Sequence, residues 1–282
     1  EAIIREMSNT VMRASRSAVI TNARDMSCGI LTYDHRLICV EEAMPIHVSA
    51  LDLTTGPITE LFDDVGARPD ATWFLAEGQD AAVLTRSIPM EKAFDDAMVV
   101  YAQNGDALMP GNGYPARLLL PGFEGNSSVK WLRRIELADR PFMTREETSK
   151  YTDPLGDGDT MRQFSFVMDA RSIITDPAFP RVIEPGWHEI RGLAWSGRGR
   201  ITAVDVSADG GTTWQAATLQ GPVLPKAHVR FRHRWEWSGS PAEVMSRATD
   251  ETGYVQPTWE ALRAARGPRT RYHQNPITSW TV

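Results

Sequence analysis

The five residues 116–120, ARLLL, lie between Pro115 and Pro121 and restrict the fold more than any other stretch. An apolar run this short does not form a stable helix, and the flanking prolines prevent its extension, so it predicts a short buried strand. Arg117 is its only charged residue. A guanidinium beside a core requires an anionic partner. From the residues alone, that partner is either a carboxylate in a structural ion pair or a bound ligand.

Turn-forming residues surround this strand. Asn104-Gly105 and Gly111–Gly113 precede it, and both tolerate positive φ. The glycine-punctuated segment 122–128, GFEGNSS, follows it and leads to Lys130. Exposed backbone N–H groups, two hydroxyls including that of Ser128, and an ammonium group are donors that bind oxyanions and phosphates. The stretch therefore predicts a candidate anion site.

Composition limits the class of protein. A chain of 282 residues is long enough for two domains, and 42% hydrophobic with 23% charged residues is typical of a soluble globular protein. The net charge of −6 argues against nucleic acid as a main partner. No apolar run approaches the roughly 18 residues of a membrane helix, so we expect no membrane insertion. The first 25 residues are charged throughout and show no signal peptide, but the chain begins with Glu1 rather than Met, which leaves export open.

Few residues offer metal ligands. Cys28 and Cys39 are the only cysteines, too few for a disulfide framework, although one bridge between them is possible. His228 and His233 are the only close histidine pair. In a strand their odd spacing directs them to opposite faces, which argues against a shared metal.

The first half mixes helices and strands without a G-x-G-x-x-G motif, which favours an α+β domain over a Rossmann domain. Its first 48 residues give the weakest patterns. We expect helices over residues 2–12, 57–66 and 90–97, strands over 15–21, 71–76, 98–102 and 131–137, and a hairpin over 29–40 that turns at Asp34-His35.

The second half is all-β by its pattern. A polar connector over residues 140–160 places a boundary near 155–162, which predicts domains of 1–158 and 159–282. Asp209-Gly210-Gly211 is a hairpin signal. Segments that alternate at a period of two predict a β-sandwich of immunoglobulin type, and they are 164–168, 186–195, 201–207, 213–219, 228–237 and 242–250.

The motif order Y-x-x-N-G, G-Y-P-x-R, P-G and V-K-W-L within residues 101–134 resembles the molybdopterin domain of the sulfite oxidase family. Within that family it is most similar to the SoxC type of bacterial sulfane (sulfite) dehydrogenases. Residues 194–200, 204–207, 209–214 and 247–253 resemble the family's dimerisation domain, so the likeness runs from about Thr55 to Val282. The resemblance implies an α+β molybdopterin-binding domain followed by an immunoglobulin-like dimerisation domain.

The resemblance also implies a molybdenum cofactor, bound through a pterin dithiolene and one cysteine thiolate, a soft ligand suited to this metal. By position, Tyr101 matches a tyrosine that faces the substrate, and Arg200 a substrate-binding arginine. Arg117, Lys130 and Ser128 lie in the stretch expected near the cofactor or its phosphate. Guanidinium groups suit a dianionic sulfur oxyanion, and a phenol suits a metal oxo or hydroxo group.

Each of these residues has a structural alternative. The Tyr101 hydroxyl can cap a strand, Arg200 together with Arg198 can form a solvated turn, and Lys130 can make a cation–π contact with Trp131.

The cysteine that would supply the metal thiolate is expected in the first part of the chain. The family's arginine-containing segment and its Cys-Ala-Gly-Asn-like turn are absent from the first part of the chain. Cys28 lies at about the expected distance before Thr55-Gly56 and is our candidate, with a buried structural cysteine as the alternative. Cys39 lies in LICV, which is typical of a core strand.

The implied activity is oxidation of sulfite or protein-bound sulfane sulfur. Because the chain has no C-x-x-C-H haem motif, the electrons would pass to a c-type cytochrome on another chain, within a homodimer or heterotetramer. The resemblance of TREETSKYTD in the connector to the SoxC branch implies a periplasmic location. The alternative is a non-catalytic relative that serves as a binding or assembly module, which the missing thiolate turn favours. The cations Arg117 and Lys130 favour the enzyme.

Overall fold

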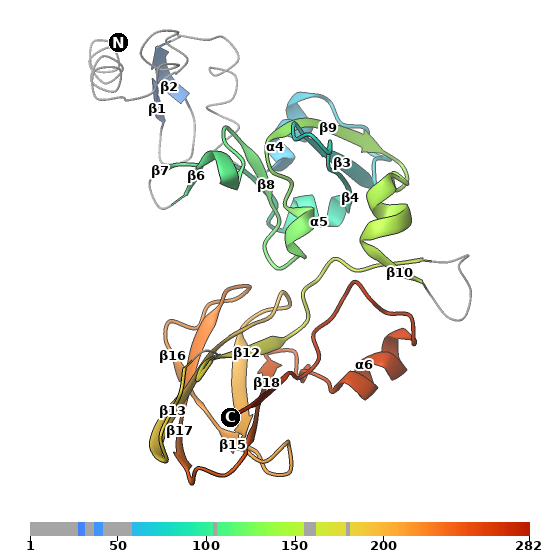
Figure 1. Cartoon of the computed structure of the whole chain (residues 1–282). Coiled ribbons are helices and arrows are strands. Elements are labelled where there is room, and N and C mark those ends of the chain that lie inside the picture. The colour runs from blue at the N-terminus through green and yellow to red at the C-terminus, as the bar shows by residue number, and fades with distance from the viewer. Residues whose placement is uncertain (1–27, 32–36, 42–57, 104–105, 155–161, 179–180) are drawn as a thin grey trace. The chain divides into compact units, whose positions relative to one another are not determined.

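The computed structural model describes residues 28–31, 37–41, 58–103, 106–154, 162–178 and 181–282 (Figure 1). It divides into two compact units. Unit 1 comprises residues up to Leu120 together with Ser127–Phe142, and unit 2 comprises Pro121–Asn126 together with Met143–Val282. The predicted helix over 2–12 and strand over 15–21 lie outside the described residues.

The predicted hairpin near the start of the chain is confirmed in its strands. β1 (Cys28–Leu31) pairs antiparallel with β2 (Leu37–Glu41), and Ile30 lies opposite Cys39. The expected turn at residues 34–35 lies outside the described residues.

A three-stranded antiparallel sheet forms the centre of unit 1, in the order β4 (Thr85–Pro89), β3 (Trp73–Gly78), β9 (Leu132–Ala138). The predicted helices are present as α4 (Ile58–Asp64) and α5 (Met90–Asp95), and α5 follows Pro89 directly. The apolar face of α4 is buried, and the Phe62 ring centroid lies 5.7 Å from that of Phe74 on β3. Helical spacing of apolar residues therefore identified α4 correctly.

Short strand pairs position the candidate site. β5 (Met98–Val100) pairs with β8 (Arg117–Leu119), and β6 (Ala102–Gln103) pairs with β7 (Asp106–Ala107). The strand expected between the two prolines is thus confirmed, and Leu118 in it is completely buried. Val100 lies opposite Arg117, so Tyr101 directly follows the residue that pairs with the arginine. Two 3-10 turns, Pro110–Asn112 and Gly125–Ser127, complete this region.

The expected polar connector has regular structure in its described part from Met143 onward, which belongs to unit 2. It contains a π-helical turn, Glu146–Lys150, and β10 (Thr152–Pro154), which pairs with β11 (Arg162–Phe164). Glu147 is completely buried and accepts a hydrogen bond from the Thr144 hydroxyl. A strand was predicted over 164–168, but the chain is a strand only to Phe164, and Val167 makes a single bridge to Phe123.

Unit 2 confirms the expected two-sheet sandwich. One sheet has the order β12 (Arg171–Asp176), β13 (Gly186–Trp195), β17 (Val229–Trp237), β16 (Thr218–Gln220). The other has the order β15 (Gln215–Ala216), β14 (Ile201–Ser207), β18 (Glu243–Asp250), β19 (Ser279–Thr281). Their inner faces form one core that includes Ile190, Val204, Phe231 and Ala248. The strand predicted over 213–219 is split, because β15 and β16 join opposite sheets.

The all-β expectation for the second half is wrong at α6 (Trp259–Arg266). Thr258 caps this helix by accepting a hydrogen bond from the Ala261 N–H at 3.2 Å. Of its eight residues only Leu262 is buried. The helix is short, and Trp259 and Leu262 are its only large apolar residues, so its pattern is too brief to stand out among the surrounding strands. No helix in the described part of the chain is long and apolar enough to cross a membrane.

The segment Pro121–Asn126 makes a close backbone approach inside unit 2. Gly122 has φ +79°, and a Cβ built on it would lie 2.4 Å from the carbonyl oxygen of Gly197. A Cβ on Gly197 would lie 1.9 Å from the carbonyl oxygen of Gly122. Met168 also donates its N–H to Gly122 at 2.9 Å. Both glycines are therefore required by the contact between the two backbones.

Candidate cofactor and anion site

The 3-10 turn Pro110–Asn112 in unit 1 accepts a side-chain hydrogen bond at each of its three carbonyl oxygens. The Pro110 oxygen accepts from the Trp131 indole N–H at 2.9 Å. The Gly111 oxygen accepts from Lys130 Nζ at 2.7 Å, and the Asn112 oxygen from Arg117 Nη1 at 3.2 Å. We call this segment the carbonyl turn. It positions the side chains of Lys130 and Arg117 through neutral backbone carbonyl groups, which do not cancel the positive charges.

Arg117 lacks a carboxylate partner among the described residues. Its Nη2 donates to the carbonyl oxygen of Ser128 at 3.1 Å, and its buried Nε has no hydrogen-bond partner in that part of the chain. Desolvation lowers the pKa of the Arg117 guanidinium from its ordinary value. The structural ion pair that the sequence left open is thus not found within the described ranges. A partly desolvated cation with an unsatisfied N–H is suited to an anionic group.

The two serines after the glycine-rich segment differ in role. Ser128 Oγ accepts the N–H of Leu120 at 3.1 Å and closes the base of the loop. Ser127 Oγ is buried and has no hydrogen-bond partner among the described residues. Sequence reasoning selected Ser128 and missed Ser127 as the unsatisfied hydroxyl, because nothing in the segment GNSS distinguishes its two serines.

The backbone around Lys130 is tightly fixed. A Cβ on Gly78 would lie 2.7 Å from the Lys130 carbonyl oxygen, and a Cβ on Gly113 would lie 2.9 Å from Lys130 Cβ. Trp131 has φ +50°, a conformation that costs a non-glycine residue energy. The cation–π contact that was the structural alternative for Lys130 is present, with its Nζ 5.8 Å from the Trp131 ring centroid, alongside the hydrogen bond to the carbonyl turn.

Tyr101 follows β5, and its carbonyl oxygen accepts the N–H of Leu108 at 2.9 Å. The residue is 36% exposed, and its hydroxyl makes no hydrogen bond with any other described residue. The alternative of a strand-capping hydroxyl therefore finds no partner in the described structure. The phenol is accessible as a donor to a ligand.

Arg200 and Arg198 lie in unit 2 and have different partners. Arg198 binds Asp169 through Nε at 2.8 Å and Nη2 at 2.6 Å. Arg200 donates its backbone N–H to Glu251 Oε1 at 3.0 Å, but its Nη1 is 3.9 Å from Glu251 Oε2 and its side chain is 55% exposed. Only Arg200 has a guanidinium that is accessible and weakly paired, so the predicted substrate role remains open to it and not to Arg198.

The role of Cys28 as the metal thiolate remains a prediction. Cys28 is the first residue of β1, and Cys39 lies on β2. Among the residues that the structure describes, no cluster of three or more His, Cys, Asp or Glu side chains is placed to hold a metal ion.

A buried charge network in unit 2 was not predicted. Asp169 is 5% exposed and, besides Arg198, it meets Arg266 Nη2 at 3.6 Å and His273 Nε2 at 3.0 Å. The orientation of the imidazole at Asp169 is poor for a hydrogen bond, so this contact is mainly electrostatic. His273 Nδ1 lies 2.9 Å from Glu124 Oε1. The network joins the segment after Pro121, the sandwich and the C-terminal segment.

Burial and neighbouring charges shift the pKa values of Asp169 and His273 in opposite directions. Burial alone would raise the pKa of Asp169, but its contacts with His273 and Arg198 lower it overall. Burial alone would lower the pKa of His273, but Asp169 and Glu124 raise it above 6.5.

We expect unit 2 to lose stability as the pH rises above 6.5 and passes through the raised pKa of His273. A group whose pKa is higher in the folded state stabilises the fold fully below its unfolded pKa and loses that contribution as it deprotonates. Urea unfolding at a series of pH values measures this slope. The His273→Gln variant should lack it, and the His228→Gln variant should keep it. An unchanged slope in His273→Gln would contradict the assignment.

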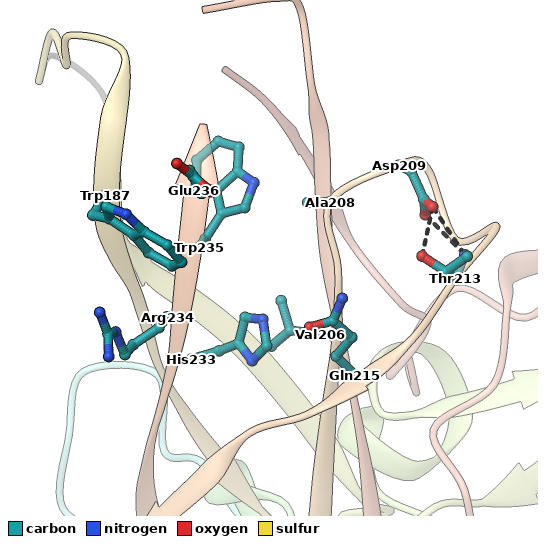
Figure 2. A pocket seen from close by; sticks show the side chains of 10 residues that line it. All are labelled: Trp187, Val206, Ala208, Asp209, Thr213, Gln215, His233, Arg234, Trp235 and Glu236. Atoms are coloured by element: carbon teal, nitrogen blue, oxygen red, sulfur yellow. Dashed lines mark hydrogen bonds between the residues drawn. The ribbon is translucent and has the colours of Figure 1, made fainter. Parts of the chain in front are cut away.

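Unit 2 also has an open cleft of about 380 Å³, shown in Figure 2. Asp209 at its edge accepts hydrogen bonds from the N–H and hydroxyl of Thr213, which lower its pKa to about 2. Arg234 stacks over Trp187 with 4.9 Å between its Cζ and the ring centroid. Acidic and basic groups are mixed here, so the cleft has no excess positive charge for an anion. It is lined by Trp187, Val206, Ala208, Asp209, Thr213, Gln215, His233, Arg234, Trp235 and Glu236.

Comparison with known families agrees with this architecture. Residues 33–146 match the oxidoreductase molybdopterin binding domain, and residues 162–279 match the Mo-co oxidoreductase dimerisation domain. The chain therefore contains the two domains found in molybdopterin oxidoreductases, and a molybdopterin-binding domain implies the molybdenum cofactor.

Individual relatives narrow this class. The chain is 34% identical to sulfite oxidase of Gallus gallus over 200 residues, which are 64% of this chain and 44% of that protein. It is 33% identical to nitrate reductase [NADH] of Solanum lycopersicum over 205 residues, 61% of this chain and 22% of that protein. A chain in the crystal structure of the sulfane dehydrogenase SoxCD from Paracoccus pantotrophus is 50% identical, with a TM-score of 0.76, over 80% of this chain and 58% of that chain. The chain belongs to the sulfite oxidase family, and it spans about half the length of these sulfur-oxidising relatives.

The donors in unit 1 fit this cofactor, because a molybdopterin carries an anionic phosphate. We expect Arg117→Gln to lower cofactor retention about tenfold or more, as loss of a charge-assisted hydrogen bond in a desolvated site would. Molybdenum and pterin content after gel filtration measures this. Arg133→Gln is a matched control, since Arg133 pairs with Glu77 at 2.7 Å on the exposed side of the sheet. Full retention by Arg117→Gln, together with reduced stability, would assign Arg117 a structural role.

Proposed function

We propose that this chain is the molybdenum-binding part of an oxidoreductase that oxidises sulfite or protein-bound sulfane sulfur. One observation carries the proposal: Arg117 and Lys130 are held by carbonyl oxygens, with no carboxylate on Arg117 among the described residues, in a domain of the molybdopterin-binding family. The sulfur substrate is supported by the similarity to sulfite oxidase and to the sulfane dehydrogenase SoxCD.

In this proposal the bound cofactor supplies two-electron oxidation with oxygen transfer at molybdenum, and the protein supplies anchoring and substrate orientation. Arg117 and Lys130 hold the anionic part of the cofactor, with Ser127 and Ser128 as neighbouring hydroxyls. Cys28 is the proposed thiolate ligand.

Two further residues have proposed roles toward the substrate. The exposed Arg200 guanidinium can form paired hydrogen bonds with a sulfur oxyanion. The Tyr101 hydroxyl, which has no partner among the described residues, can donate a hydrogen bond to the substrate.

We propose that the electrons leave to a c-type cytochrome on another chain and that the enzyme works in the periplasm. The dimerisation domain supports an oligomer, either a homodimer or a heterotetramer with the cytochrome. The SoxCD relative supports an enzyme of the sulfane dehydrogenase kind.

The test is molybdenum content and turnover of protein purified from a host that makes the cofactor. We expect near-stoichiometric molybdenum and reduction of cytochrome c that depends on sulfite or thiosulfate. Nitrate-dependent oxidation of a reduced dye is the contrasting assay, because nitrate reductases are among the relatives. Nitrate turnover without sulfite turnover would overturn the substrate proposal. A folded dimer without molybdenum would instead indicate a non-catalytic relative, a binding or assembly module.

A further inference from the structure

A second cleft in unit 2, of about 480 Å³, carries several cations. One wall is formed by the π-helical turn and β10, and the other by the chain that follows α6, both visible in Figure 1. Its lining residues are Ser149, Lys150, Thr152, Asp153, Pro154, Arg269, Arg271 and Tyr272. All of them belong to unit 2.

Among the described lining residues, Asp153 is the one carboxylate, and both of its oxygens already accept hydrogen bonds. Asp153 is 1% exposed. Its Oδ1 accepts the N–H groups of Arg271 at 2.7 Å and Tyr272 at 2.9 Å. Its Oδ2 accepts the Thr270 hydroxyl at 3.0 Å and the His273 N–H at 3.3 Å. Asp153 therefore fixes the backbone of the second wall, and no ion pair joins it to the side chain of Lys150 or Arg271.

The cations of this cleft are unevenly compensated. The Lys150 ammonium and the Arg271 guanidinium make no ion pair or side-chain hydrogen bond with any described residue. Arg269 contributes a third positive charge to the same lining. Like charges that converge on one cleft repel each other unless an anion lies between them.

The walls around these cations are held in place. The Ser149 hydroxyl donates to the carbonyl oxygen of Arg145 at 2.8 Å. The Tyr272 ring packs edge-on against Tyr151 at 5.4 Å between centroids, and its hydroxyl accepts a hydrogen bond from Asn126. A site whose walls are fixed before binding loses less entropy when a ligand is bound.

We propose that this cleft binds a tetrahedral oxyanion of the phosphate or sulfate class, held by Lys150 and Arg271 with Arg269 adding positive charge. A guanidinium presents paired N–H groups that match two oxygens of such an anion, and an ammonium acts as a second point charge. The cleft is formed without Arg117, Lys130, Tyr101 or Arg200, so this inference does not rest on the proposed redox function.

The experiment is calorimetric titration of the whole protein with inorganic phosphate and with sulfate, in chloride buffer at constant ionic strength. We expect saturable binding that falls about tenfold or more in the double variant Lys150→Gln, Arg271→Gln. Arg263→Gln is the control, because Arg263 lies on α6 over the Trp259 ring at 4.9 Å and is absent from the cleft lining. Near-ultraviolet circular dichroism checks that the double variant is folded.

Several results would overturn this inference. They are an absence of saturable binding, equal binding by the double variant and the wild type, or a response that follows ionic strength alone. Binding that is lost in Arg200→Gln but retained in the double variant would place the anion at the proposed substrate arginine instead.

Discussion

Replacing Asp169 by asparagine is expected to lower the free energy of unfolding of unit 2 by about 3 kcal/mol. The carboxylate is buried and is the common partner of Arg198, Arg266 and His273. Removing one member of a buried ion network leaves the others desolvated without a counter-charge, which costs about 3 to 5 kcal/mol. We expect the lower end of that range because the Arg198 side chain is 43% exposed and water partly screens it.

Urea unfolding followed by tryptophan fluorescence measures this effect, since seven of the nine tryptophans lie in unit 2. Asp205→Asn is the matched control. Its carboxylate pairs with Arg247 at 3.1 Å, but both side chains are about one-third exposed, so we expect a loss of less than about 1 kcal/mol. Equal losses in the two variants would show that the Asp169 network has no special role in stability.

Replacing Cys28 by serine is expected to reduce molybdenum-dependent turnover by more than about a hundredfold. A nearby metal lowers the pKa of a cysteine thiol, and the resulting thiolate is a soft ligand. A serine hydroxyl is a hard ligand and remains protonated near neutral pH. Loss of groups that merely support a metal ligand already costs about tenfold to a hundredfold. The loss of the ligand itself should cost at least as much.

The measurements are turnover with sulfite and molybdenum content per chain, for Cys28→Ser and for Cys39→Ser. The second variant is a close control because Cys39 lies on β2, the strand that pairs with β1. Its partner there is Ile30, two residues after Cys28. We expect it to retain both metal and activity. Full activity in Cys28→Ser would eliminate Cys28 as the thiolate, and a loss confined to Cys39→Ser would transfer the role to that residue.

Local signals explain what the sequence predicted correctly. The two prolines around ARLLL determined the extent of β8, and the apolar spacing in residues 57–66 identified α4. The candidate cations were recognisable because Arg117 and Lys130 follow turn-rich segments and no acidic residue lies on β8. The hydrogen bonds that hold them to the carbonyl turn were not predictable, because every residue has a backbone carbonyl and the sequence does not show which of them accepts a side-chain hydrogen bond.

The network around Asp169 illustrates what the sequence could not show. Its members come from positions 124, 169, 198, 266 and 273, and no short spacing connects them. Only the folded sandwich brings them together. The same reason applies to the cleft with Lys150 and Arg271, which are more than one hundred residues apart. In both places, long-range packing and not local pattern makes the charge cluster.

The course of the chain through Pro121–Asn126 has a practical consequence. The backbone leaves unit 1 after Leu120, returns to it at Ser127 and leaves it again after Phe142. No single cut can therefore separate the two units into complete pieces. A chain truncated after Phe142 would retain Gly122 and Glu124 but lose Gly197 and His273, the residues they contact. The cofactor-binding part is thus expected to be produced well only as one polypeptide with its dimerisation domain.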